Sequence, residues 1–379
     1  MALTVFMVAL GLILYSYFGY PVLLWILTVG KRKARTRLPS ELPTVSVIIT
    51  AHDEQEVIEE KIQNSLNLNY PKDKLEIIVA SDGSTDGTNA IVRRYQDKGV
   101  ILLALSERVG KTVAQNEAVK VARGDLLVFS DANGIYDQNA VLELIRPFSD
   151  PAVGCVSGEL QYSNPEGTGA GRGESLYWRY EQFLKRKESL LGSLLGANGS
   201  IYAVRRRLFA PLDPDIISDF ILPLQVYKMG YQVKYEPRAM SMEQSCVQFS
   251  DEFKRRKRIV ARSLRGLASE RDLLNPFKYG IFAFQMTSHK LLRWGVPLLL
   301  AAMFISNGFL LGEGPYALFF GLQLAFYGLG IVGSLFASRL NVAGVFYIPA
   351  YFCLMNLGVL AGIASYLKGG APVTWESVR

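Results

Sequence analysis

A run of 28 residues without a charged side chain, at residues 2–29, limits what this chain can be. A helix needs about 20 apolar residues to cross a bilayer, so the run predicts a membrane span. Five basic residues follow at once and favour a cytoplasmic flank: Lys31, Arg32, Lys33, Arg35 and Arg37. A cleavable signal peptide is the alternative, but its basic cluster precedes a shorter apolar stretch. We therefore expect residues 1–37 to form an N-terminal transmembrane anchor.

Three more apolar stretches lie toward the other end of the chain, at residues 295–311, 317–337 and 343–367. Each is long enough to span a bilayer, the first only just. Residues 276–294 before them mix aromatic side chains with Lys278, Lys290 and Arg293, a composition typical of a helix in the membrane interface. The sequence thus predicts four spans, with residues 276–379 forming an interfacial helix and about three transmembrane helices. We expect an integral protein of the inner or plasma membrane.

The polar middle of the chain, residues 38–275, has the pattern of an α/β domain. Apolar runs at 44–50, 75–80, 100–105 and 126–129 predict strands. Segments 56–68, 85–98 and 111–122 have helical spacing and lie between them. Strands that alternate with helices predict a mainly parallel sheet covered by helices on both faces. In such sheets ligands bind beyond the carboxyl ends of the strands.

Three of those strand ends carry acidic residues. The first strand runs into Asp53 and Glu54, the second into Asp82, and the fourth into Asp131 and Asn133. Any one of these segments can be an ordinary turn with a helix cap. Carboxylates that converge on one crevice repel each other unless a cation or hydrogen-bond donors lie among them, so three such ends predict a binding site. The chain lacks Gly-x-Gly-x-x-Gly and the Walker phosphate motif, which argues against those nucleotide sites.

The charge balance also bears on the binding partners. Lys and Arg number 41 against 34 Asp and Glu, a net charge of +7, and basic runs occur at residues 205–207 and 254–258. Such runs can mark nucleic-acid binding. In a chain with membrane spans, anionic headgroups fit better, so we expect no nucleic-acid partner. Three widely separated cysteines indicate neither a disulfide framework nor a Cys-x-x-Cys metal site.

Several of these segments occur together in one known family. They are Val45-Ser46-Val47-Ile48-Ile49 with Glu54, Ser81-Asp82-Gly83-Ser84 with Asp86, Gly110-Lys111, Asp131-Ala132-Asn133, Gly196-Ala197-Asn198-Gly199 and Ser218-Asp219. In this order, and with flanking spans, the chain resembles an inverting family 2 glycosyltransferase of the GT-A fold. The resemblance is to the membrane-embedded group that includes cellulose, chitin and hyaluronan synthases, and it covers nearly the whole chain.

The resemblance implies a role for each matching residue. Asp82 is expected to hold the uridine of a UDP-sugar, and Asp131 with Asn133 to bind Mg²⁺ or Mn²⁺ on the diphosphate. Asp219 is expected to be the general base. The remaining donor contacts are expected from Ala51, Glu54, Lys111 and Arg262, and Arg265 is expected to assist catalysis.

Elementary chemistry agrees with these roles. A departing diphosphate needs a hard cation, and an acceptor hydroxyl needs a base as it attacks. Asp219 lies in the apolar setting Ile216-Ile217-Ser218-Asp219-Phe220, which raises the proton affinity of a carboxylate. A helix N-cap for residues 220–229 is the other interpretation of Asp219.

The chain departs from the family pattern in two places. The third position of the metal motif is Asn133, where the family usually has Asp, and a neutral oxygen binds a hard cation more weakly than a carboxylate. The family's Gln-x-x-Arg-Trp motif corresponds here to Arg262-Ser263-Leu264-Arg265-Gly266. The aromatic platform for an acceptor sugar is therefore absent at Gly266, which weakens the case for processive polymer synthesis.

Three functions remain open from the sequence. The first is transfer of a hexose from a UDP-sugar to a growing polysaccharide or oligosaccharide, with the catalytic domain in the cytoplasm. The second is the same transfer to a membrane lipid, which gives a glycolipid. The third is a non-catalytic membrane subunit that binds nucleotide sugar.

Overall fold

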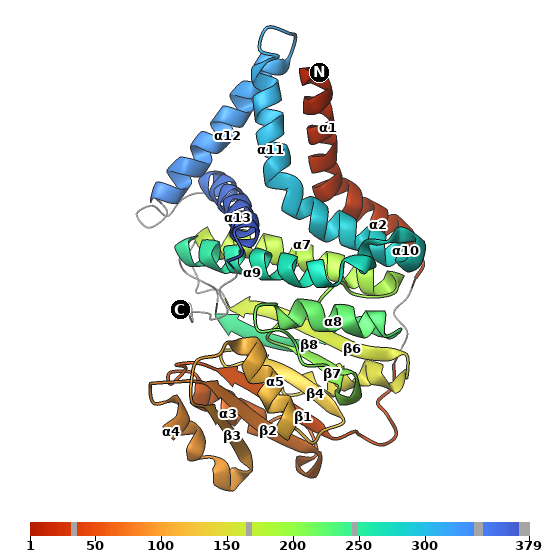
Figure 1. The fold of residues 1–379 in the computed structure, drawn as a ribbon, viewed down its shortest axis with the longest axis vertical. Helices are drawn as coiled ribbons and strands as arrows, with labels where there is room; N and C mark the ends of the chain where they lie inside the picture. The colour runs from red at the N-terminus through yellow and green to blue at the C-terminus, as the bar shows by residue number, and fades with distance from the viewer. Residues whose placement is uncertain (32–35, 164–168, 245–248, 337–343, 371–379) are drawn as a thin grey trace.

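The protein has three tiers in its computed structural model (Figure 1). A sheet with its covering helices lies at one end, two long helices lie across the middle, and apolar helices project from the other end. The structure describes residues 1–31, 36–163, 169–244, 249–336 and 344–370. The basic residues at 32, 33 and 35, Cys246 and the last nine residues lie outside the described residues.

The sheet has eight strands in the order β3-β2-β1-β4-β7-β6-β8-β5. Strands β3, β2, β1 and β4 are parallel, as the alternating pattern predicts. The second half is mixed, because β7 is antiparallel to β4 and β6 while β6 and β8 are parallel. The bounds are β1 Val45–Ala51, β2 Leu75–Asp82, β3 Val100–Leu105, β4 Leu126–Asp131, β5 Ile135–Tyr136, β6 Val153–Ser163, β7 Tyr202–Arg205 and β8 Gln232–Gln244.

Apolar side chains cover both faces of this sheet, which explains why its central strands read as continuous apolar runs. One core packs α3 (Ile58–Leu66), α4 (Thr88–Arg93) and α6 (Ala140–Ile145) against the sheet. The other core contains residues of α5 (Lys111–Val121), α8 (Ser218–Lys228) and the helices that follow. Every residue of β1 is buried. The expected α/β architecture with helices on both faces is confirmed.

Among the described residues, four helical runs are long and apolar enough to cross a membrane: Ala2–Thr28, Pro276–Gly308, Tyr316–Leu335 and Val345–Leu367. The first contains α1 (Ala2–Leu14), a π-helical turn at Tyr15–Gly19 and α2 (Tyr20–Thr28). The second joins α10 (Pro276–Gln285), a π-helical segment at Met286–Leu291 and α11 (Leu292–Gly308). Residues 276–294, expected as a separate interfacial helix, thus continue into the span. The other two runs belong to α12 (Tyr316–Phe336) and α13 (Gly344–Leu367).

The middle tier consists of α7 (Gly169–Leu191) and α9 (Phe249–Ser269) and fastens the sheet to the apolar helices (Figure 1). Helix α13 packs closely on α9 because two glycines face it. A Cβ at Gly358 would lie 3.0 Å from the Cβ of Arg256, and one at Gly362 would lie 2.8 Å from the carbonyl oxygen of Lys257. On α7, the buried Glu188 accepts a hydrogen bond of 2.7 Å from the Tyr20 hydroxyl. The tiers are thus held together by side-chain contacts as well as by the chain that runs between them.

Candidate active site

The strand ends expected to carry the chemistry meet at one edge of the sheet. Ala51, the buried last residue of β1, pairs with Ser81 of β2, and Thr50 pairs with Asp131 of β4. The backbone N–H of Glu54 donates to the Thr88 hydroxyl at 2.8 Å and so holds the turn after β1 against α4. Three segments far apart in sequence therefore lie side by side at one edge of the sheet.

Asp82 organises the loop that leads into α5. Its side chain is fully buried and accepts hydrogen bonds from the backbone N–H of Val109 at 2.7 Å and of Gly110 at 2.9 Å. Gly83 beside it has a φ of +59°, and a Cβ there would lie 2.5 Å from the backbone nitrogen of Arg108. Only glycine allows this close approach. Asp82 thereby fixes the start of α5, where Lys111 is the first helical residue.

Asp131, Lys111 and Asp219 form the centre of the site. The ammonium of Lys111 is paired with the Oδ1 of Asp131. A Cβ at Gly199 would lie 2.6 Å from the Oδ2 of Asp219 and 3.4 Å from the Nζ of Lys111, so both groups border the Gly199 backbone. The structure thus brings together two acidic residues that are 88 positions apart, with a cation beside them.

The environment of Asp219 raises the pKa of its carboxyl group. Burial raises the pKa of Asp219, and the carboxylate of Asp131 adds to this, whereas Lys111, Lys185 and Arg262 oppose it. Burial also lowers the pKa of Lys111, but the two carboxylates more than offset this and the net shift is upward. A carboxylate with a raised pKa accepts a proton more readily, so Asp219 suits a general base.

Asp219 does not cap the helix that it begins. The N-cap of α8 is Ile217, and Asp219 lies in the first turn. Its backbone carbonyl accepts a hydrogen bond of 2.7 Å from the N–H of Ala197, which ties α8 to the glycine-rich loop. The N-cap interpretation of Asp219 is therefore wrong, and its carboxylate is available to the crevice.

The two arginines of the Arg262–Arg265 segment lie in different surroundings. Arg262 is buried and donates from Nη2 to the Thr112 hydroxyl at 3.1 Å and to the Pro214 carbonyl at 2.9 Å. It therefore clamps the loop before α8 to the start of α5. Arg265 instead pairs with Asp215 and lines an open surface hollow, so the structure does not bring it into contact with Asp131 or Asp219.

Three further charged residues, for which the sequence analysis predicts no role in the site, also lie near this centre. Burial, followed by the charge of Asp131, raises the pKa of Glu243 on β8 to about 7. Burial lowers the pKa of Lys61 on α3 to about 7, and its ammonium contacts the Gly134 carbonyl. Arg258 on α9 interacts electrostatically with Asp131 and Asp219. Each lies in a long amphipathic or alternating segment, where sequence spacing gives no sign that the side chain reaches this crevice.

The donor set fits a divalent cation that shares its coordination with phosphate oxygens. Asp131 is about one-third exposed and Asn133 is exposed, so solvent and ligands can reach both side chains. The described residues contain no group of three or more His, Cys, Asp and Glu placed to hold a metal by themselves. Mg²⁺ and related ions are commonly held by one or two protein oxygens together with substrate phosphates, which is the arrangement available here.

Comparison with known proteins identifies the family that the middle of the chain matches. Residues 46–212 match the family described as Glycosyl transferase family 2. The probable glycosyltransferase YdaM of Bacillus subtilis is 32% identical over 218 residues, which are 54% of this chain and 51% of that protein. The poly-beta-1,6-N-acetyl-D-glucosamine synthase of Staphylococcus aureus (strain COL) is 30% identical over 207 residues, 53% of this chain and 50% of that protein. The chain spans about half the length of these curated relatives.

A solved structure extends the fold comparison to nearly the whole chain. The mannosyltransferase PcManGT from Pyrobaculum calidifontis, in complex with GDP-Man and Mn²⁺, superposes with a TM-score of 0.73 at 22% identity. The match covers 96% of this chain and 99% of that one, including the helices long enough to span a membrane. The chain therefore carries a family 2 glycosyltransferase domain of the GT-A fold, flanked by four candidate transmembrane helices.

Proposed function

We propose that this protein is a membrane-bound, inverting hexosyltransferase that moves a sugar from a UDP-sugar to an acceptor hydroxyl. One observation carries the proposal. Asp219, whose pKa is raised by burial, lies in one crevice with Lys111 and Asp131. The crevice thus combines a base for the acceptor with cationic and metal-binding groups for the diphosphate.

The reaction is a single displacement. Asp219 accepts the proton of the acceptor hydroxyl as its oxygen forms a bond to the anomeric carbon. The bond between that carbon and the diphosphate oxygen breaks on the opposite face, and UDP leaves with the electron pair. One base and one displacement invert the anomeric configuration.

The groups around the diphosphate have separate tasks. Lys111, Arg258 and Arg262 place positive charge around the crevice, since each interacts electrostatically with Asp219. Mg²⁺ or Mn²⁺ held by Asp131 and Asn133 supplies further charge neutralisation for the leaving diphosphate. Asp82 acts on the donor end of the crevice by fixing the loop at Val109 and Gly110, and Ala51 and Glu54 belong to the same strand edge.

Two acceptor classes fit this chemistry. A growing saccharide is favoured by the name of the Staphylococcus relative, a polysaccharide synthase. A membrane lipid is favoured by the packing at Gly266, where a Cβ would lie 2.4 Å from the side chain of Ile221. The space that an aromatic acceptor platform needs at that position is filled, which argues for single transfer.

The location follows from the basic flank of the first span. Positive residues at 31–37 favour the cytoplasmic side, and the catalytic domain follows them directly. We therefore place the catalytic domain in the cytoplasm and the apolar helices in the inner or plasma membrane.

The test is UDP release by the detergent-purified protein over a panel of UDP-sugars, with GDP-mannose as a competing donor class. Each donor is assayed with lipid and with oligosaccharide acceptors, with and without Mg²⁺ or Mn²⁺. Turnover with one UDP-hexose that disappears in Asp219→Asn is expected. Equal turnover in Asp219→Asn removes the proposed base, and donor binding without turnover under all conditions favours a non-catalytic subunit.

A further inference from the structure

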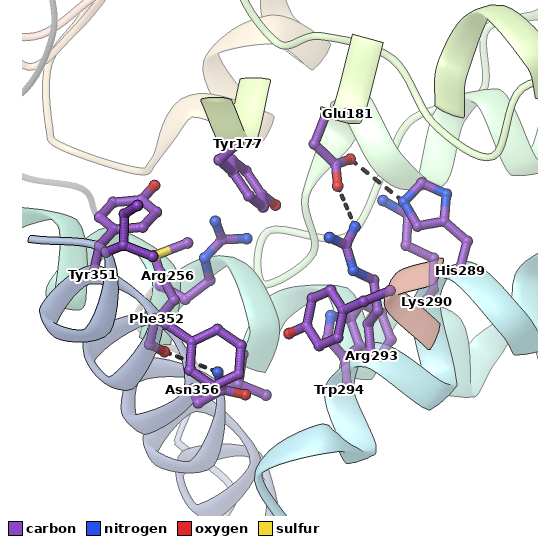
Figure 2. Close-up of a pocket in the computed structure, with 14 residues that line it drawn as sticks. Tyr177, Glu181, Arg256, His289, Lys290, Arg293, Trp294, Tyr351, Phe352 and Asn356 are labelled. Carbon is purple, nitrogen blue, oxygen red and sulfur yellow. Dashed lines mark hydrogen bonds and ion pairs between the residues drawn. The ribbon is translucent and has the colours of Figure 1, made fainter. Parts of the chain in front are cut away.

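A cavity of about 250 Å³ lies where the middle tier meets the apolar helices. Residues from five segments line it: the π-helical turn after α1, α7, α9, the run into α11, and α13. Figure 2 shows Arg256 and Arg293 extending into the same space from different helices, beneath Tyr177 and Glu181. The strand edge described above does not contribute to its wall.

One side of the cavity is cationic. Its lining includes Arg256, Lys290 and Arg293, against the single carboxylate of Glu181. Glu181 pairs with Arg293 and lies 3.4 Å from the ring of His289, so its charge is engaged. The positive charge of the lining therefore exceeds its negative charge by two.

Two of these cations have spare binding capacity. Arg256 lies 3.8 Å from Glu252, which binds Arg255 more closely at 2.5 Å. The Nε of Arg256 has no hydrogen-bond partner among the described residues. Within the same ranges Lys290 makes no hydrogen bond or ion pair, and its ammonium lies 5.8 Å from the ring centre of Phe220. Arg256 thus keeps an unused Nε donor beside its pair with Glu252 and its hydrogen bond to Tyr177, and Lys290 is a half-buried cation without an ion pair in those ranges, so this side suits an anion.

The part of the lining that α13 contributes is largely apolar, with Tyr351 and Asn356 as its polar members. Ile348, Phe352, Met355 and Val359 follow one another at helical spacing along this wall. Because α13 is long and apolar enough to span a membrane, the wall continues the hydrocarbon-facing part of the protein. The cavity therefore combines a membrane-like wall with a cationic wall, the two surfaces that an anionic amphiphile needs.

One layer of side chains separates the cavity from the first turn of α8. Trp294 and Lys290, which line it, both contact the ring of Phe220, with the Trp294 ring 6.1 Å away between centres. Phe220 directly follows Asp219 in the first turn of α8. Lys185 interacts electrostatically with Glu181 and Lys290 on one side and with Asp219 on the other. A group seated in the cavity is therefore next to the first turn of α8.

We propose that this cavity binds the anionic headgroup of the membrane lipid that accepts the sugar. This inference rests on the proposed transfer reaction and names its acceptor class. Arg256 and Lys290 bind the headgroup phosphate, and the α13 wall packs against the beginning of its hydrocarbon chains. The headgroup hydroxyl then reaches Asp219 from the membrane side.

A saccharide chain fits these observations less well. A neutral sugar gives Lys290 no counter-charge, and it has no use for the aliphatic side chains of Ile348, Met355 and Val359. A lipid uses both surfaces at once.

The first experiment measures lipid binding without turnover. Native mass spectrometry follows dioleoylphosphatidylglycerol and dioleoylphosphatidylcholine added to the full-length protein in detergent. The double variant Arg256→Gln/Lys290→Gln is compared with Lys254→Gln/Lys257→Gln, which removes two charges from exposed positions of α9. We expect phosphatidylglycerol to bind the first variant at least about tenfold more weakly than wild type and the control equally well. Phosphatidylcholine is expected to bind weakly to all three.

A second variant separates loss of binding from loss of folding. Met355→Trp fills the cavity from its apolar side without changing a charge, and it is expected to weaken phosphatidylglycerol binding as well. Unchanged binding in the Arg256→Gln/Lys290→Gln variant overturns the proposal, as does equal affinity for the two lipids. The proposal is also wrong if both cavity variants weaken the binding of a short hexose oligomer but leave the binding of phosphatidylglycerol unchanged.

The catalytic readout is kept apart from the binding readout. Asp219→Asn is expected to bind phosphatidylglycerol like wild type, because the base does not form the cavity. If wild type binds the lipid but turns over no UDP-hexose, the proposed transfer reaction is refuted and the lipid-binding site stands. If the binding experiments show no lipid site but the protein still releases UDP, only the assignment of the acceptor is refuted.

Discussion

The most direct test of the catalytic centre is Gly199→Ala. A Cβ at this position would lie 2.6 Å from the Oδ2 of Asp219. An ordinary non-bonded contact is about 3.5 Å, so the carboxylate has to move by about 0.9 Å. A displacement of this size at a reacting group can cost about 100-fold in rate, and we expect kcat to fall by that factor.

The same change leaves the fold intact. Gly199 does not have the left-handed backbone conformation that requires glycine, and alanine restricts the unfolded chain. The cost of moving the Asp219 carboxylate opposes this gain, so we expect the melting temperature to fall by at most a few degrees. Gly192→Ala is the matched control, because a Cβ at Gly192 has no atom within 4 Å and the position precedes the same loop.

The assay is UDP release at saturating donor and acceptor, together with thermal unfolding of the purified protein. Wild-type kcat in Gly199→Ala refutes the placement of Asp219 beside the reacting atoms. An equal loss in Gly192→Ala shows that any change in this loop is harmful and removes the argument from contact distance.

Four further outcomes are expected. In Lys111→Gln the pKa of Asp219 rises further because a neighbouring cation is lost, so the acid limb of the kcat–pH profile moves to higher pH; an unmoved limb contradicts the role of Asp219. Asp82→Asn leaves the N–H groups of Val109 and Gly110 poorly paired and costs about 1–3 kcal/mol, checked by chemical denaturation. Gly266→Ala costs about 1–3 kcal/mol, and Ile221→Val restores part of it in a double-mutant cycle. EDTA abolishes UDP release and Mn²⁺ or Mg²⁺ restores it, whereas activity that persists in chelator removes the metal from the scheme.

The first half of the sheet is predictable because its signal is local. Strands β1 to β4 are buried runs that alternate with helices, and each observed strand lies within two residues of its expected bounds. The second half depends on long-range pairing. Strand β7, at Tyr202–Arg205, joins β4 to β6 in antiparallel contact, and no periodicity within four residues specifies such partners.

The candidate site was predictable in part for the same reason. Asp131 follows a recognisable strand end, and Asp219 lies in a motif that the family resemblance identifies. The contact of both with Lys111 requires the folded sheet. The sequence alone also does not show that Arg262 and Arg265 have different surroundings, because two residues three positions apart on a helix lie on the same face. Only the contacts show that Arg262 clamps the loop before α8 while Arg265 pairs with Asp215.

The positions of the two proposed substrates relative to Asp219 bear on the stereochemistry. Strands β1 and β2, whose ends hold Asp82 and the donor loop, lie at the far side of the sheet from the apolar helices (Figure 1). The cavity lined by Lys290 and Trp294 lies on the membrane side, in contact with Phe220. A donor bound at one end and an acceptor entering from the other approach Asp219 from opposite directions. A single displacement that uses Asp219 as its base is expected to give the inverted anomeric configuration, and a product with retained configuration contradicts that reaction.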